Sequence, residues 1–274
     1  MCLGERICSA LHSHHMQNRL RKLCEDRAAG RRTIPELLRG LKSIGPKLVP
    51  FFKTVTIFFV LYGDSAKPNS VVYCIIKCLP ILSLIIFVLL NSVTYSKPYS
   101  YSHKILYGLM CSCVGDAFLV WKEECFLHGV AIFAVAHVFY ASAFGFRPLG
   151  TSSGIIFSSL AAVGYWYVLP GLTGILFPLG TLYFMLIFMM VWCAVARVKH
   201  TKGGCGWPEM SGCIGALLFI VSDFVLALNL FYQDIPYSHP IVMVTYYAAQ
   251  LGISLSIIDN RTNTKQDKVP KASE

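Results

Sequence analysis

The chain has 274 residues, of which 55% are hydrophobic and only 14% are charged, whereas a soluble domain carries about a quarter charged residues. That composition excludes a soluble globular enzyme and indicates a helical integral membrane protein. The formal net charge is +10, but ten of the 24 lysines and arginines lie in the first 47 residues, so the excess indicates a basic tail rather than a nucleic-acid-binding surface.

The basic tail comprises residues 1–45 and has no apolar stretch long enough for the core of a signal peptide. Its histidine cluster, His12, His14 and His15, is typical of a disordered basic segment rather than of a metal site. We therefore expect a disordered cytosolic tail that stays attached to the rest of the chain.

Residues 46–258 are expected to form a membrane domain, because they contain repeated apolar runs of the roughly 17 to 25 residues that a helix needs to cross the hydrocarbon core. Pro170 and Gly171 predict a tight hairpin between the fifth and sixth runs. The expected fold is an all-α bundle of eight transmembrane helices, followed by a polar cytosolic tail at residues 259–274. The expected spans are residues 47–62, 70–91, 104–121, 126–144, 153–169, 172–196, 211–231 and 239–258.

The distribution of lysine and arginine predicts the orientation, because short cytoplasmic loops retain positive charge. On one side of an eight-span chain the loops contain only Lys67 and Lys122. The other side collects both tails together with Lys97, Lys104, Arg147, Arg197, Lys199 and Lys202. We therefore expect both termini in the cytoplasm.

The cysteines do not predict a metal site or a disulfide framework. Most of the 11 cysteines fall inside apolar runs, where thiols behave as small hydrophobic groups. Pairs such as Cys74 with Cys78 and Cys111 with Cys113 match no zinc-binding spacing. We expect neither a metal nor another cofactor.

Four ionisable side chains lie well inside the expected spans: Lys77, Asp116, His137 and Asp223. Such groups cost roughly 2.5 to 3.5 kcal/mol each on insertion scales, so each calls for a partner or a function. Counting along the helices places Lys77, Asp116 and Asp223 at similar depths, roughly 8 to 12 Å from their outer ends. We interpret Asp116 and Asp223 as candidate catalytic groups, with a purely structural ion cluster as the alternative.

The two aspartates also indicate an internal duplication. Tyr140 follows Asp116 by 24 residues, and Tyr247 follows Asp223 by 24 residues. Copies four spans apart run in the same direction, which predicts two parallel four-helix repeats with a site between them near the midplane. Lys77 has no counterpart, because the equivalent offset before Asp223 falls on Phe184.

Further polar side chains share helix faces with these groups. Phenols and amides in membrane helices more often form hydrogen bonds between helices than bind ligands, and a lone buried histidine is as often structural as catalytic. The candidates for substrate-binding or supporting roles are Lys77, His137, Tyr140, Asn229, Tyr246, Tyr247 and Gln250.

Five motifs mark the membrane domain: Lys77-Cys78-Leu79-Pro80, Gly115-Asp116-Ala117-Phe118-Leu119, His137-Val138-Phe139-Tyr140-Ala141-Ser142, Ser222-Asp223 with Ala227-Leu228-Asn229, and Thr245-Tyr246-Tyr247-Ala248-Ala249-Gln250. Together they resemble the YhhN-like lysoplasmalogenase family, the transmembrane protein 86 group. The resemblance extends from Gly45 to about Ser256, and the basic tail lies outside it.

The resemblance implies an enzyme of the endoplasmic reticulum membrane that hydrolyses the vinyl ether bond of lysoplasmalogens. The products would be a fatty aldehyde and glycerophosphoethanolamine or glycerophosphocholine. Such chemistry needs a proton donor for the β-carbon, a carboxylate to deprotonate water, and room for a long chain. Asp116 and Asp223 in an apolar bundle would supply the two carboxyl groups. Lys77 would keep one of them ionised or bind the phosphate of the substrate.

The partners expected from this interpretation are the lysoplasmalogen substrate and the bilayer, with no nucleic acid. A proton-coupled transporter or lipid carrier that uses the same intramembrane carboxylates is the main alternative, because parallel repeats also occur in such proteins. A seven-span receptor is less favoured, because the basic residues indicate an even number of spans.

Overall fold

The computed structural model describes residues 44–65, 69–94, 100–146, 159, 162–199 and 206–258. Residues 1–43 of the expected amino-terminal tail and all of the expected carboxy-terminal tail lie outside these ranges. The chain divides into two compact units, residues 1–47 and 48–274, and the bundle described below belongs to the second.

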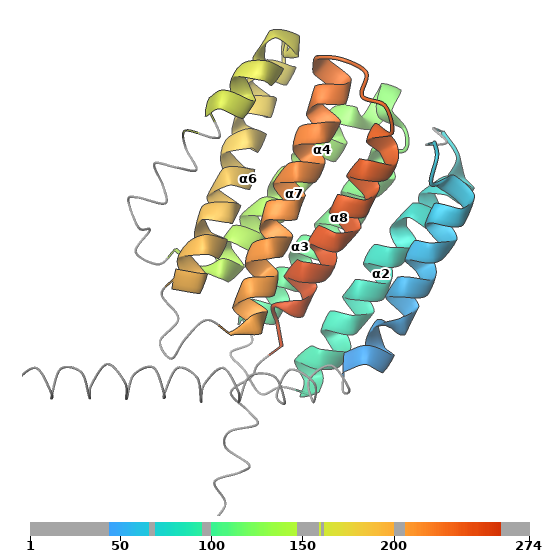
Figure 1. Ribbon diagram of the computed structural model, residues 1–274, viewed down its shortest axis with the longest axis vertical. Coiled ribbons are helices and arrows are strands. Elements are labelled where there is room, and N and C mark those ends of the chain that lie inside the picture. The colour runs from blue at the N-terminus through green and yellow to red at the C-terminus, as the bar shows by residue number, and fades with distance from the viewer. Residues whose placement is uncertain are drawn as a thin grey trace, which may run out of the picture. The chain divides into compact units, whose positions relative to one another are not determined.

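Every regular element in the described ranges is a helix, so the expected all-α class is confirmed (Figure 1). The first helix, Ile44–Tyr62, carries no label in the figure. The labelled elements are α2 (Val71–Thr94), α3 (Ser100–Phe118), α4 (Lys122–Phe144), the short η1 (Leu169–Gly171), α6 (Leu176–Lys199), α7 (Trp207–Phe231) and α8 (Ser238–Leu255). Of the expected fifth span, residues 159 and 162–168 are described as helical.

The ends of the helices differ by up to four residues from the expected spans. Several helices begin earlier than expected, because their first turns are polar and apolar runs mark only the part that lipid or protein buries. Helix α3 instead ends early, at Phe118, where the backbone N–H groups of Val120 and Trp121 donate to carbonyls three residues back and turn the chain into α4. This turn is itself apolar, so hydrophobicity alone did not reveal it.

Five helices in the described ranges are long and apolar enough to cross a membrane. Helix α3 is not among them, since it starts with polar residues and contains Asp116. Helix α8 has 18 residues, which is long enough, but its polar first turn and Gln250 lower its hydropathy. The five are Ile44–Tyr62, Val71–Asn91, Lys122–Phe144, Leu176–Val198 and Trp207–Phe231. The expected count of eight spans and the internal repeat therefore stay predictions.

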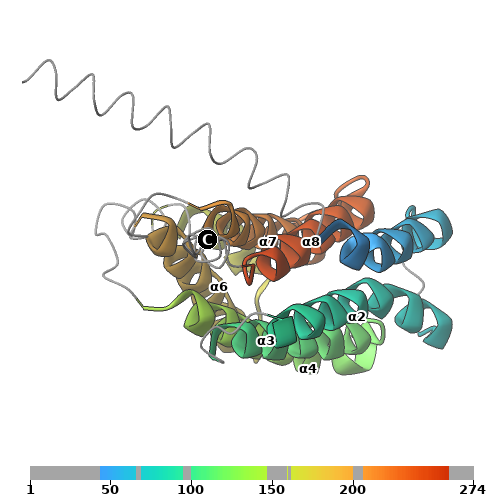
Figure 2. The same cartoon turned by 90° about the horizontal axis from the view of Figure 1, so that it is seen from below.

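The labelled helices form two facing layers (Figure 2). Helices α2, α3 and α4 lie side by side in one layer, and α7 and α8 form the other. Helix α6 packs against both α4 and α7 and closes one edge, while α2 contacts α8 toward the other edge. Phe58 of the first helix contacts Tyr73 of α2 and Tyr247 of α8 through its ring.

Close approach of α7 and α8 depends on two glycines. A Cβ atom at Gly215 would lie 2.7 Å from the carbonyl oxygen of Ala249, and one at Gly252 would lie 2.8 Å from that of Ser211. Small residues allow membrane helices to bring their backbones together, and here they fix α7 and α8 as one unit. The side chains of Asp223 on α7 and Tyr246 on α8 are therefore carried by a single rigid support.

Candidate functional site

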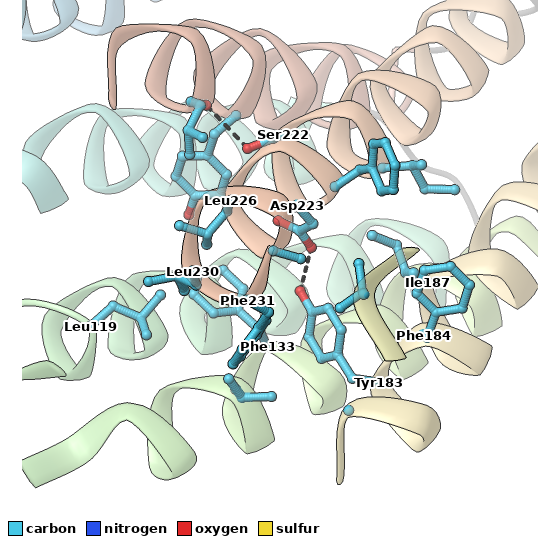
Figure 3. A pocket seen from close by; sticks show the side chains of 18 of the residues that line it. Leu119, Phe133, Tyr183, Phe184, Ile187, Ser222, Asp223, Leu226, Leu230 and Phe231 are labelled. Carbon is cyan, nitrogen blue, oxygen red and sulfur yellow. Dashed lines mark hydrogen bonds between the residues drawn. The ribbon is translucent and has the colours of Figure 1, made fainter. Parts of the chain in front are cut away.

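A cavity of about 530 Å³ is lined by residues of both helical layers and of α6 (Figure 3). Both candidate aspartates line it, Asp116 from α3 and Asp223 from α7, and so do Lys77 and Tyr246. Two carboxyl groups from opposite layers therefore open into one space. Lys77, Asp116 and Asp223, which were expected at one level, meet at this cavity, and Tyr246 joins them; their meeting does not by itself give them a chemical role.

The Asp116 carboxylate is surrounded by donors. The ammonium group of Lys77 lies 3.1 Å from one carboxylate oxygen. The hydroxyl of Tyr246 donates to the other oxygen at 2.5 Å. The side chains of Lys77 and Asp116 are only 9% and 3% exposed, so burial itself would penalise either charge without its partner. This arrangement favours Asp116 as a carboxylate, neutralised by Lys77.

Asp223 has a different environment (Figure 3). The hydroxyl of Tyr183 donates to one of its carboxyl oxygens, and His137 Nε2 lies 3.7 Å from the same oxygen. No lysine or arginine forms an ion pair with Asp223 in the described part of the chain. Its side chain is 20% exposed, toward the cavity. The two aspartates thus differ in the charge beside them, which is the condition for two carboxyl groups to take unequal roles.

The contacts of His137 favour its neutral form. Because the Tyr183 hydroxyl donates to Asp223, its oxygen accepts from His137 Nε2, which lies 3.0 Å away. The Nδ1 atom of His137 is buried without a hydrogen-bond partner among the described residues. An unprotonated nitrogen tolerates this better than an N–H group, because an unmet donor is costly to bury. His137 therefore orients Tyr183, and Tyr183 orients Asp223.

Tyr183 is a functional candidate that the sequence analysis missed. It lies 40 residues before Asp223, and Lys77 lies 39 residues before Asp116. The 39-residue offset between Lys77 and Asp116, when applied to Asp223, points to Phe184. An offset of 40 residues would have identified Tyr183 as the partner of Asp223. A phenol in an apolar run also carries no charge, and therefore gave no signal of its own.

Phe219 contacts one ring of each polar cluster. Its ring lies 4.8 Å from the ring of His137 and 5.5 Å from the ring of Tyr246, measured between centroids. Its side chain is fully buried, so it links the two clusters through an apolar contact in the interior.

Three predicted supporting residues lie outside the cavity lining and bond helices together. Tyr140 donates to Gln250 at 2.8 Å, and Tyr247 donates to the backbone carbonyl of Lys77 at 2.9 Å. The second bond joins α8 to α2 at Lys77, the residue whose ammonium group pairs with Asp116. These contacts correspond to the helix-to-helix role that the sequence left open for phenols and amides.

Asn229 bonds to the connection that follows α7. Its side-chain oxygen accepts from the backbone N–H of Ile235 at 2.9 Å, in the connection between α7 and α8. Ser222, which directly precedes Asp223, donates through its hydroxyl to the backbone carbonyl of Val242 at 3.1 Å. Both bonds hold the end of α7 against the start of α8, and neither residue reaches the Asp116 or Asp223 carboxyl group through an observed bond.

Toward α6 and α7 the cavity is lined mainly by apolar side chains. Such walls suit a hydrocarbon chain, since little polar surface would have to be desolvated there. Its walls come mainly from α6 and α7 and include Leu179, Phe184, Ile187, Leu217, Ile220, Phe224 and Leu230.

The described residues contain no group of three or more histidine, cysteine or acidic side chains that would hold a metal ion. The cysteines in these ranges are free. The carboxyl, phenol, imidazole and ammonium groups at the cavity can transfer protons, stabilise charge and activate water.

Comparison with known proteins gives a family. Residues 72–257 match the model of the YhhN family. The chain is 42% identical over 233 residues to "Lysoplasmalogenase TMEM86A" of Bos taurus, which covers 85% of this chain and 97% of the relative. It is 41% identical over 234 residues to the protein of that name from Homo sapiens, with the same coverage. It is 42% identical over 219 residues to "Lysoplasmalogenase TMEM86B" of Sus scrofa, covering 78% and 87%.

No solved structure is significantly similar to the chain.

Proposed function

Because the chain belongs to the YhhN family, we propose that it is a lysoplasmalogenase, an intramembrane hydrolase that cleaves the vinyl ether bond of lysoplasmalogens. The products are a fatty aldehyde and glycerophosphoethanolamine or glycerophosphocholine. The observation that carries the proposal is that Asp116 and Asp223, with unlike partners, line one largely apolar cavity.

We assign the role of general acid to Asp223. One of its oxygens accepts from Tyr183, which leaves the other for a proton that points to the substrate. No lysine or arginine pairs with it among the described residues, so no such cation beside it holds a negative charge in place. In the first step Asp223 gives this proton to the β-carbon of the vinyl ether. The double bond is consumed, and an oxocarbenium ion forms at the α-carbon.

Asp116 then acts as the base. Its charge is maintained by Lys77, and it stabilises the nearby cation before it takes a proton from water. The resulting hydroxide adds to the α-carbon and gives a hemiacetal. The hemiacetal collapses when its hydroxyl proton returns to Asp223 and the proton on Asp116 moves to the departing glycerol oxygen. Both carboxyl groups thereby regain their starting states, and one water is consumed for each bond that is cleaved.

Purified protein in detergent provides the test of this function. Incubation with lysoplasmalogen should release aldehyde and the matching glycerophospho product in equal amounts, with no ion gradient present. A transporter or lipid carrier requires no such reaction. Absence of aldehyde from folded, monodisperse protein would reject the hydrolase and favour the carrier.

We also propose that the domain crosses the endoplasmic reticulum membrane eight times with both termini in the cytoplasm. Support comes from the positions of the basic residues, and from α3 and α8, which lie within the bundle beside apolar helices that qualify as spans. In sealed vesicles of the endoplasmic reticulum, whose cytoplasmic face points outward, tags at Met1 and Glu274 should both be accessible to protease. A cysteine introduced at Lys122 should react only from the opposite side. Accessibility of the termini on different sides would require an odd number of spans.

A further inference from the structure

Three basic side chains line the cavity at one end of the bundle: Lys77 of α2, Lys122 of α4 and His239 of α8. Lys122 is the first residue of α4, and His239 is the second residue of α8. Both interact electrostatically with Lys77, and His239 also interacts with Lys122. A hydrogen bond of 3.2 Å from the backbone of Asn69 to that of Val120 joins the start of α2 to the end of α3 at this same end.

Within the described residues, only one of these basic groups has a carboxylate partner. Lys77 pairs with Asp116. Lys122 is exposed and forms no ion pair or hydrogen bond with any described residue, so it stands at the mouth of the cavity. Like charges that face one space repel each other, and an anion between them would relieve that repulsion.

One further donor, the phenol of Tyr73, faces the same space beside the imidazole of His239. His239 Nε2 lies 3.0 Å from the backbone carbonyl of Tyr62, so that nitrogen carries a proton and the imidazole is held in place. Tyr73 lines the cavity, its side chain is otherwise buried, and its hydroxyl has no hydrogen-bond partner among the described residues. Its ring lies 6.5 Å from that of His239. The mouth thus presents a lysine and a phenol with donor capacity to spare, while the Nε2–H group of His239 is already bound to Tyr62.

We propose that Lys122 and Tyr73 bind the phosphate group of the lysolipid beside His239, an inference that rests on the proposed function. A phosphodiester carries one negative charge and accepts hydrogen bonds, which matches these donors. In a lysoplasmalogen the phosphate is separated from the vinyl ether oxygen only by the glycerol carbons. A phosphate at the mouth would place the vinyl ether beside Asp116 and direct the chain toward the apolar walls of α6 and α7.

Binding rather than turnover tests this inference, so the result does not depend on the proposed activity. The two probes are a 1-alkyl lysophosphatidylcholine, whose saturated ether is not cleaved, and the matching 1-alkylglycerol, which has the chain and glycerol without the phosphate. Affinity of each for the full-length protein in detergent is measured by calorimetry or by displacement of a fluorescent fatty chain.

Lys122→Met should weaken binding of the lysophospholipid about tenfold, because it removes one charge-assisted contact, and should leave binding of the alkylglycerol unchanged. Lys122→Arg keeps the charge and should retain most of the affinity. Lys53→Met is the matched control, since Lys53 is an exposed lysine that does not line this cavity.

Equal weakening of both probes by Lys122→Met, or no weakening of either, would overturn the subsite. Inorganic phosphate should compete far more weakly than the lysophospholipid, because it lacks the chain. If it competed as strongly, the site would be one for a free anion and the assignment to the lipid would be wrong. Normal binding of the lysophospholipid by a protein that releases no aldehyde would reject the proposed function and keep the subsite.

Discussion

The ammonium group of Lys77 and the carboxylate of Asp116 lie 3.1 Å apart, and the pair is almost fully buried between α2 and α3. The Tyr247 hydroxyl donates to the backbone carbonyl of Lys77, and the Tyr246 hydroxyl donates to the carboxylate oxygen of Asp116 that is not paired with Lys77. Asp223, which lines the same cavity, has no such cation among the described residues. This difference explains how two aspartates in one apolar space could carry different charges.

Lys77→Met should lower the free energy of unfolding by about 3 to 5 kcal/mol, because it leaves an uncompensated carboxylate in the protein interior. Adding Asp116→Asn should recover most of this loss, because the stranded charge is then removed. Thermal unfolding of the detergent-solubilised variants measures both effects, with Lys53→Met as the control for loss of a lysine. Simple additivity of the two changes would show that the groups are not coupled.

Tyr183→Phe should lower kcat about tenfold, because it keeps the ring but removes the hydrogen bond that orients Asp223. Tyr165→Phe is the matched control: Tyr165 also lines the cavity, but its hydroxyl bonds to Thr181 rather than to a carboxyl group. Rates of aldehyde release per folded molecule distinguish the two. An equal decrease in both variants would mean that Tyr183 acts only through packing.

A chain that begins near Lys47 should keep its turnover per folded molecule, because every candidate site residue lies downstream of the basic tail. The tail is instead suited to anionic lipid head groups, where each cation near the surface contributes about 1 kcal/mol. The contribution of the tail to lipid binding is measured by comparing how the truncated and full-length proteins associate with vesicles that contain acidic lipid. Loss of turnover in a truncated protein that remains folded would show that the tail takes part in the chemistry.

The sequence predicted the helical class and the meeting of Lys77, Asp116 and Asp223, because charge inside an apolar run is a strong signal. Tyr246 was named as a supporting residue, but its bond to Asp116 was not predicted, since packing of α3 against α8 decides it. Tyr183 was missed because a phenol carries no charge, and the end of α3 was misplaced because the turn after Phe118 is as apolar as a span.

The cavity itself could not be predicted from the sequence. It depends on how α6 joins the two layers, and no spacing along the chain encodes that contact. Lys122 and His239 were not identified as site residues from the sequence either. Each lies at the start of a helix, where a charged or polar residue is common. Only the fold brings these two side chains together with Lys77 around one cavity.

The central claim is that Asp116 and Asp223 act as one catalytic unit, and single-turnover and steady-state rates of Asp116→Asn, Asp223→Asn and the double variant test it most directly. Each single change should lower aldehyde release per folded molecule by about 10²- to 10⁴-fold, the usual contribution of a general acid or base. The double variant should be scarcely slower than the poorer single variant, because groups that act together are not additive. Hydrolysis of lysoplasmalogen at a near wild-type rate by either folded single variant would contradict the account.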